Sequence, residues 1–269
     1  MPYRFHLEVW LLVAFCVWLG FYVSRGLAPR WSGSDSDKYQ GVTKQQKATY
    51  AAAVFFLWLA SDWPLHDLSE DYLYFVHMIQ HLLITFVVPP LLLLATPEPL
   101  ARTVLGGHLD AAPSPIFRKL THPVLAGVAF NVVVAITHLP WVVNTAANNG
   151  SFHYFAHFAL FGFALLMWMP VCSPIPELRL GLPTQMAYLF AMSILPTIPA
   201  GFLTFADSSI YEAYTGAFGI SATSDQQAAG LIMKIAGGFY LWTIIAILFF
   251  RWSATNQKSE QRTSVLQNS

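Results

Sequence analysis

The sequence predicts an all-α integral membrane protein, a bundle of seven transmembrane helices with its N-terminus outside and its C-terminus inside. The first observation is composition: of 269 residues, 55% are hydrophobic and only 10% are charged, whereas soluble domains carry about 25% charged residues. The second is length, because the apolar stretches approach the roughly 20 residues that a helix needs to cross a bilayer. The third is the placement of lysine and arginine, which alternates from loop to loop.

Charge and cysteine content exclude several other classes of protein. The net charge is zero, which provides no basic surface for nucleic acid, so no nucleic-acid partner is expected. A mean hydropathy of +0.50 argues against a water-soluble enzyme. The two cysteines, Cys16 and Cys172, form no CxxC motif and no disulfide framework.

Turn-forming residues separate the predicted spans. The spans cover residues 7–23, 48–63, 72–95, 123–140, 152–171, 185–206 and 227–250. The turn segments are 32–37, 106–115, 144–151 and 174–183. We expect each span to be helical, because backbone polar groups in lipid must be satisfied within the segment.

The basic residues predict the orientation of these spans. Apart from Arg4 and Lys234, every lysine and arginine falls in the first, third or fifth loop or in the C-terminal tail, which the positive-inside rule places in the cytoplasm. The first span also resembles a signal peptide, but most of the basic residues around it follow the apolar run, so we expect a retained helix. We expect one membrane domain, residues 1–250, and a polar, disordered cytoplasmic tail, residues 251–269.

Most of the histidines map to the outer side of this topology. They are His6, His66, His77, His81, His138, His153 and His157. All but His6 and His66 lie near the outer ends of the third, fourth and fifth spans, in a layer within about 15 Å of the surface. Two pairs have His-x₃-His spacing, which places both imidazoles of a pair on one helix face. Because ionisable groups in a membrane are costly and usually mark function, the five predict a metal or cofactor site.

The donor types limit which ion this site would bind. Imidazole suits copper, zinc, iron and nickel, whereas magnesium and calcium prefer oxygen ligands. Thiolate ligands are not expected, because neither cysteine maps to the histidine layer. The residues therefore favour copper or haem iron, with zinc behind them. Asp62, His66 and Met78 are weaker candidate ligands, and hydrogen-bonded packing is the alternative role for each histidine.

Other polar residues inside the spans have predicted structural roles. Asn131 lies two turns from His138 on the same face, and we expect it to hydrogen-bond the imidazole. Lys234 is expected to pair with Asp207, or else to extend outward to the membrane interface. Pro89 and Pro90 are expected to kink the third span.

One region of the sequence resembles a known family. Residues 75–97, FVHMIQHLLITFVVPPLLLLATP, are similar to the signature helix of the multi-span CtaG family of cytochrome c oxidase assembly proteins. THLP at 137–140, the His-x₃-His pair at 153–157 and DWPL at 62–65 extend the resemblance over about residues 48–250. The similarity is to this multi-span family, and not to the single-span periplasmic copper chaperone that shares its name.

The resemblance implies a bacterial plasma-membrane protein that helps to assemble a haem-copper oxidase by handling copper, and therefore an assembly factor rather than an enzyme. By matched motif, it implies that the metal ligands are His77, His81, His138, His153 and His157, with His66, Asp62 and Met78 as further candidate ligands. The implied partners are an oxidase subunit and the lipid bilayer. A periplasmic copper donor and a second copy of the chain are further candidate partners.

Two other functions stay open at this point. Imidazoles on facing helices could hold haem b in an electron carrier, although haem does not explain two ligands from one helical turn. A metal transporter would explain proline-broken helices and an intramembrane lysine. Against it, the inner halves of the spans offer almost no polar path.

Overall fold

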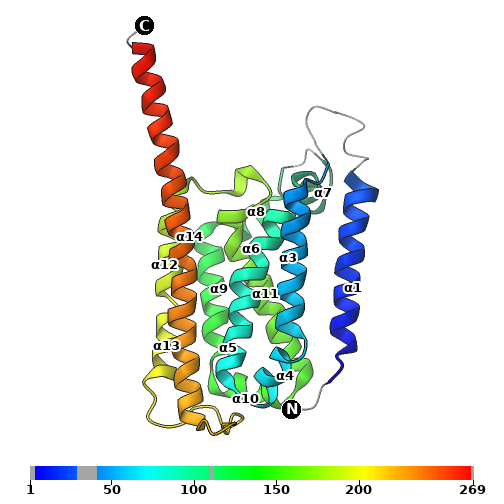
Figure 1. Cartoon of the computed structure of the whole chain (residues 1–269), viewed down its shortest axis with the longest axis vertical. Coiled ribbons are helices and arrows are strands. Elements are labelled where there is room, and N and C mark those ends of the chain that lie inside the picture. The colour runs from blue at the N-terminus through cyan, green and yellow to red at the C-terminus, as the bar shows by residue number, and fades with distance from the viewer. Residues whose placement is uncertain (1–3, 29–40, 110–111, 268–269) are drawn as a thin grey trace.

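The computed structural model describes residues 4–28, 41–109 and 112–267, and every regular element in these ranges is a helix (Figure 1). The predicted all-α class is therefore confirmed. In chain order the elements are α1 (Leu7–Phe21), η1 (Tyr22–Leu27), α3 (Lys44–Ser61), α4 (Leu65–Asp71), α5 (Tyr74–Leu82), η2 (Leu83–Val87), α6 (Val88–Ala95), α7 (Glu98–Gly106), α8 (Pro115–Leu120), α9 (Pro123–Thr137), α10 (Pro140–Asn148), α11 (Gly150–Cys172), η3 (Pro176–Leu178), α12 (Leu182–Ile194), α13 (Thr197–Thr204) and α14 (Ala222–Gln267).

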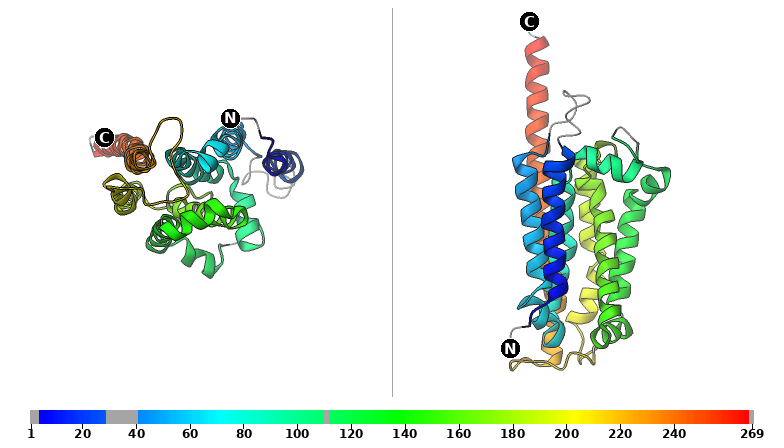
Figure 2. Two further views of the ribbon diagram at one scale, coloured as in Figure 1. Left: turned by 90° about the horizontal axis from the view of Figure 1, so that it is seen from below. Right: turned by 90° about the vertical axis from the view of Figure 1, so that its right-hand side faces the viewer.

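The long helices stand side by side, and short helices close the two ends of the bundle (Figure 1). Helices α4 and α10 lie at the same end as the N-terminus, whereas α7 and α8 lie at the other, as Figure 2 also shows. We call the end formed by α4, α10 and the residues before α1 the histidine end. The end formed by α7 and α8 is called the opposite end.

Among the described residues, five helical segments are long and apolar enough to cross a membrane, and a sixth qualifies if a bent pair of helices counts as one span. The five are Leu7–Leu27, Tyr74–Ala95, Gly150–Cys172, Leu182–Thr204 and Ala222–Lys258. The bent pair is α9 with α10, which meet at 69°. A multi-span membrane protein is thus supported, while the count of seven spans and their orientation stay predictions.

The predicted span 48–63 corresponds to α3, which does not meet these criteria. Its first turn is the polar run 44–47, and the Thr43 hydroxyl caps it by accepting a hydrogen bond of 3.1 Å from the N–H of Gln46. Helix α3 nevertheless stands upright beside α1 and packs against α6 (Figure 1). It occupies the place of the predicted second span, with a polar start. The predicted turn at 32–37 lies outside the described residues.

The exposed surface of the bundle is apolar. Large side chains on its outside are mostly uncovered, with Phe158 exposed by 77%, Phe202 by 72% and Phe239 by 71%. The core contains fully buried Trp168 and Tyr74. Because soluble monomers seldom expose extensive apolar surface, this distribution indicates that the outside of the bundle faces lipid.

The fourth span ends earlier than the sequence predicts. We expected a helix over 123–140 followed by a turn at 144–151, but α9 ends at Thr137 and α10 begins at Pro140. Proline has no N–H for the carbonyl four residues earlier, so the first helix cannot continue through it. Its fixed φ angle favours the first turn of a new helix. The chain therefore bends at this point, and α10 extends across the histidine end.

Helices α5, η2 and α6 form one span, Tyr74–Ala95. The π-helical turn η2 directly precedes Pro89 and Pro90, neither of which can donate a backbone hydrogen bond. The disruption expected from the two prolines is absorbed in this wider turn.

Helix α14 continues to Gln267, where composition predicts a disordered tail from residue 251. Figure 1 shows this last part extending beyond the other helices. The structure thus assigns helical backbone to the polar tail, since its Lys, Glu, Gln and Arg residues have good helix propensity. The division of the chain near residue 250 stays a proposal.

Candidate metal centre

Helix α5 presents His77 and His81 to the interior of the histidine end. Both imidazoles are buried, and their ring centroids are 4.3 Å apart. The start of the helix is held by α14, because the Asp225 carboxylate accepts hydrogen bonds of 2.8 and 2.9 Å from the N–H groups of Tyr74 and Phe75. A carboxylate here satisfies free N–H groups and interacts favourably with the helix dipole. Asp225 therefore positions the helical turn that carries both histidines.

Helix α11 contributes the second pair, His153 and His157. Their ring centroids are 4.1 Å apart. The helix begins after Asn149, whose side-chain oxygen accepts a hydrogen bond of 3.1 Å from the N–H of Phe152. The Nε2 atoms of His81 and His157 lie 3.1 Å apart across the interface between the helices. Two imidazoles this close need either a shared proton or a shared ion between them.

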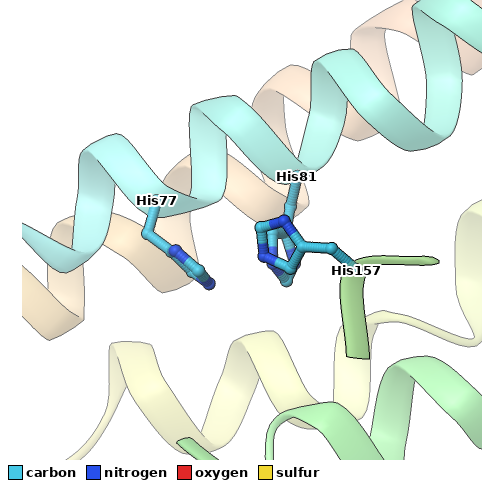
Figure 3. Close-up of side chains that lie close together, drawn as sticks. All are labelled: His77, His81 and His157. Atoms are coloured by element: carbon cyan, nitrogen blue, oxygen red, sulfur yellow. The ribbon is translucent and has the colours of Figure 1, made fainter. Parts of the chain in front are cut away.

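His77, His81 and His157 converge on one point, as Figure 3 shows. One nitrogen of each lies within 4.8 Å of one nitrogen of each of the others. We call these three residues the histidine cage. A cavity of about 30 Å³ borders them, and Val142 and Val143 of α10 form part of its wall. Three imidazole ligands and this space suit a single transition-metal ion.

His138 lies at the corner between α9 and α10, beside the cage. Its ring is perpendicular to that of His81, with centroids 6.1 Å apart. Its Nδ1 is 2.6 Å from the carbonyl oxygen of Val134, while its buried Nε2 has no hydrogen-bond partner. A carbonyl can only accept, so Nδ1 carries the proton and Nε2 keeps its lone pair. His138 is therefore oriented as a ligand, although it lies outside the closest group.

Glu70 of α4 belongs to the site, and the sequence analysis missed it. Its Oε1 is 2.9 Å from Nε2 of His153 and 3.7 Å from Nδ1 of His77. With His153 and His157 it forms another group able to hold an ion. Burial alone would raise the pKa of Glu70, but the imidazoles of His153 and His77 outweigh it and hold that pKa below its ordinary value. Glu70 lies four residues after His66 and therefore on the same face of α4. This spacing could have indicated Glu70 as a candidate ligand, but only if the segment had been predicted to be helical.

Two buried polar residues fasten α4 to the bundle. The Ser69 hydroxyl lies 2.9 Å from Oε1 of Gln80, and Nε2 of Gln80 donates a hydrogen bond of 2.8 Å to the carbonyl of Ala60. Since Gln80 precedes His81, this link fixes α4 relative to the cage. It explains the polar residue inside the His-x₃-His motif.

A third group of candidate ligands comprises His6, His66 and Asp67. Burial would lower the pKa of His6, but the hydrogen bond to Asp67 and its charge, with the help of Glu8, raise it. For His66, burial lowers the pKa, and the charges of Glu70 and Asp67 only partly oppose it.

Asp62, predicted as a weaker ligand, is buried and accepts a hydrogen bond of 2.8 Å from the indole N–H of Trp58. It belongs to none of the three groups of candidate ligands found among the described residues. Its role as a ligand stays a prediction.

Several buried side-chain atoms of the described residues have no hydrogen-bond partner, and all lie at the histidine end. They are Asp62 Oδ1, His66 Nδ1, Asp67 Oδ2, Glu70 Oε1, His77 Nδ1, His138 Nε2 and His153 Nε2. The atoms of Glu70 and His153 face each other, but not in hydrogen-bonding geometry. Buried polar atoms are normally paired. A gathering of unpaired imidazole nitrogens and carboxylate oxygens therefore points to bound cations.

Comparison with known proteins identifies the family. The sequence model of the cytochrome c oxidase caa3 assembly factor family (Caa3_CtaG) matches residues 21–255. The chain belongs to this family. No curated protein and no solved structure matches the chain. The resemblance deduced from the His-x₃-His and double-proline motifs is thereby confirmed.

In this member of the family, Met78 is buried and Asn131 is half-buried. Met78 lines a second cavity, of about 50 Å³, whose wall also includes His81 and His138. Asn131 does not bond His138 as expected; its Nδ2 donates to the carbonyl of Gly127 at 2.8 Å and contacts Sδ of Met192 at 3.4 Å. The carbonyl of Val134 accepts the hydrogen bond from Nδ1 of His138 instead.

The expected pairing of Lys234 with Asp207 is also corrected. Nζ of Lys234 donates to Oγ1 of Thr197 at 2.5 Å and to the carbonyl of Ser193 at 3.3 Å. The break between α12 and α13 frees that carbonyl, which lies closer to Lys234 than the loop carboxylate does. Asp207 is exposed. Lys234 thus bridges the broken helix rather than forming the expected ion pair with Asp207.

Proposed function

We propose that this chain is a copper-handling membrane assembly factor for a haem-copper cytochrome c oxidase, acting at the extracytoplasmic side of a bacterial plasma membrane. Copper is its cargo, and the chain has no enzymatic role. The observation that carries the proposal is the convergence of His77, His81 and His157 on one point. His138 and His153 border this point and supply further ligands.

The chemistry of the donors supports copper. Imidazole binds copper and zinc well, and the buried site offers no thiolate, since Cys172 ends α11 at about 28 Å from His153 by helix rise. Membership of an oxidase assembly family favours copper over zinc, because copper is a constituent of haem-copper oxidases. The thioether of Met78 beside the cage adds a soft donor that suits Cu(I).

The geometry does not favour haem b. A haem iron bound by two histidines lies between them with the flat macrocycle separating the rings. The Nε2 atoms of His81 and His157 are only 3.1 Å apart, and the adjoining cavity is about 30 Å³. A macrocycle would have to force α5 and α11 apart. A small ion fits this space without such a movement.

The distribution of charge supports the extracytoplasmic side. Basic residues of α3, α7 and α8 lie at the opposite end, which the positive-inside rule places in the cytoplasm. At the histidine end Arg4 is paired with Asp71 at 2.5 Å.

We also propose that the chain has seven spans, one membrane domain over residues 1–250 and a cytoplasmic tail over residues 251–269.

The partners follow from this position. An oxidase subunit would take copper by exchanging its own ligands for the imidazoles of the cage, and a periplasmic copper donor would deliver it. A second copy of the chain is a further candidate partner. Ligand exchange suits a site of neutral imidazoles, because each can leave as an uncharged group.

Copper analysis of the full-length protein, purified in detergent, tests the proposal. The wild type is compared with the double variant His77→Ala/His81→Ala and with a control, His108→Ala/His122→Ala, whose histidines are exposed and lie outside the histidine end. We expect the first variant to lose copper and the control to retain it. In cells, the first variant should also leave the oxidase deficient in copper.

Three results would contradict the proposal. Equal copper content in both variants would show that the histidine cage is not the copper site. A Soret band in the purified protein would favour the haem carrier. Copper accumulation by sealed vesicles that contain the protein would favour a transporter.

A further inference from the structure

The third group of candidate ligands, His6, His66 and Asp67, lies where α4 meets the segment before α1. Nε2 of His6 is 2.6 Å from Oδ1 of Asp67, and Nδ1 of His66 is 3.6 Å from the same oxygen. The rings of His6 and His66 have centroids 4.9 Å apart. One ligand atom from each residue lies within 4.8 Å of those from the other two. The three side chains therefore surround one small volume.

The buried atoms of this group are incompletely paired. Asp67 is only 2% exposed, yet its Oδ2 has no hydrogen-bond partner, and neither has Nδ1 of His66. A buried carboxylate with an unpaired oxygen is costly unless a cation compensates it. The nearby guanidinium of Arg4 is paired with Asp71 instead. Oδ1 of Asp67 is paired with His6, whereas Oδ2 of Asp67 and Nδ1 of His66 are both left unpaired at this point.

We infer that His6, His66 and Asp67 form a second metal site, separate from the histidine cage, that binds a divalent transition-metal ion. The two groups share no residue. His66 is one helical turn from Glu70, which contacts His153 and belongs to the group Glu70, His153 and His157, so α4 carries residues of two separate groups of candidate ligands. The inference does not depend on the metal that the cage binds.

The ligand set indicates the kind of ion. Two imidazoles and one carboxylate suit Zn²⁺ or Cu²⁺, whereas Cu⁺ prefers softer donors. Three protein ligands leave at least one coordination position open for water or an incoming group. The side chains of His6 and His66 are each about 15% exposed, so an ion can reach them from solvent.

Binding at this site would also fasten the first helix to the bundle. Within α1 only Val9 is buried. The helix packs against α3, where the Tyr50 hydroxyl donates a hydrogen bond of 2.8 Å to the carbonyl of Cys16, and the Tyr154 hydroxyl of α11 donates to Glu8 at 3.3 Å. His6 directly precedes α1, whereas His66 and Asp67 belong to α4. An ion bound by all three therefore joins two segments about 60 residues apart in the chain.

Zn²⁺ titration of the metal-stripped, full-length protein in detergent tests the inference. The titrations use a His81→Ala/His157→Ala background, because His157 belongs to both other groups of candidate ligands. Adding His6→Ala or the isosteric Asp67→Asn should abolish the remaining binding. Adding His122→Ala, which removes an exposed imidazole outside the histidine end, should leave it unchanged. Hydrogen exchange near residue 8 should slow on Zn²⁺ addition in the background protein and not with Asp67→Asn.

The outcomes separate this inference from the proposed function. It is overturned if the background protein binds no Zn²⁺, or if binding survives both His6→Ala and Asp67→Asn. Neither result bears on the proposed function, because the copper content of the cage is measured in protein with His6, His66 and Asp67 unchanged. Zn²⁺ binding without any change in hydrogen exchange would overturn the fastening of α1.

Discussion

The indole N–H of Trp168 donates a hydrogen bond of 2.9 Å to the carbonyl of Thr85. In an α-helix that carbonyl would accept from residue 89, and in a π-helical turn from residue 90, but both are prolines. Trp168 is fully buried, so water cannot replace this bond. The double proline of α6 and the tryptophan of α11 thus form one structural unit between the cage and the opposite end of the bundle.

Replacing Trp168 with Phe should destabilise the protein by about 1–3 kcal/mol, because the buried carbonyl of Thr85 loses its donor. Thermal unfolding in detergent measures the effect. Trp242→Phe is the matched control, since Trp242 is 51% exposed on the outside of the bundle. Equal melting temperatures for the two variants would contradict the structural role of the bond.

Gly230 should tolerate no larger residue, because α14 approaches α13 closely there. A Cβ at this position would lie 2.5 Å from Oγ1 of Thr204 and 2.7 Å from the carbonyl oxygen of Ala200. Gly230→Ala is expected to cost about 1–3 kcal/mol through overpacking. At Gly238 a Cβ meets nothing within 4 Å, so Gly238→Ala should be neutral or stabilising by up to about 1 kcal/mol. A scan of unfolding temperatures that ranks the two variants in the reverse order would contradict this packing.

The spacing of histidines along single helices predicted much of the candidate site. His77 and His81, and likewise His153 and His157, share a face because helix geometry fixes residues four apart. The predicted spans placed both pairs at the same depth in the membrane, on the helices α5 and α11. The structure brings His77, His81 and His157 within reach of one ion. These relationships are local or follow from the topology, so sequence patterns contain them.

The contributions of Glu70, His6 and Asp67 could not be predicted in this way. Glu70 reaches the histidines only because 65–71 forms a helix that Ser69 and Gln80 fix in place. The contact between His6 and Asp67 joins parts of the chain 61 residues apart, and no periodicity encodes it. Such contacts depend on tertiary packing, which also decides that α10 covers the site.

The carboxylate of Asp225 should matter for both stability and metal binding. Asp225→Asn weakens the hydrogen bonds to the N–H groups of Tyr74 and Phe75, which should cost about 1–3 kcal/mol. The displaced turn carries His77, so copper affinity should fall as well, even in protein that stays folded. Asp207→Asn, at an exposed carboxylate, is the control. Unchanged copper affinity in folded Asp225→Asn protein would show that Asp225 does not position the ligands.

The lowered pKa of Glu70 predicts how the free energy of unfolding depends on pH. Since His153 and His77 hold its pKa below the ordinary 4.5, its charge stabilises the folded state above about pH 4.5, and this contribution declines as the pH falls further. In metal-free buffer, Glu70→Gln should therefore be less stable than the wild type above about pH 4.5, and the difference should shrink as the pH falls below this value. Unfolding temperatures measured across this range check it, with Glu212→Gln as the exposed control. A difference that already vanishes near pH 6 would mean that the carboxylate is protonated there and is not held by the two imidazoles.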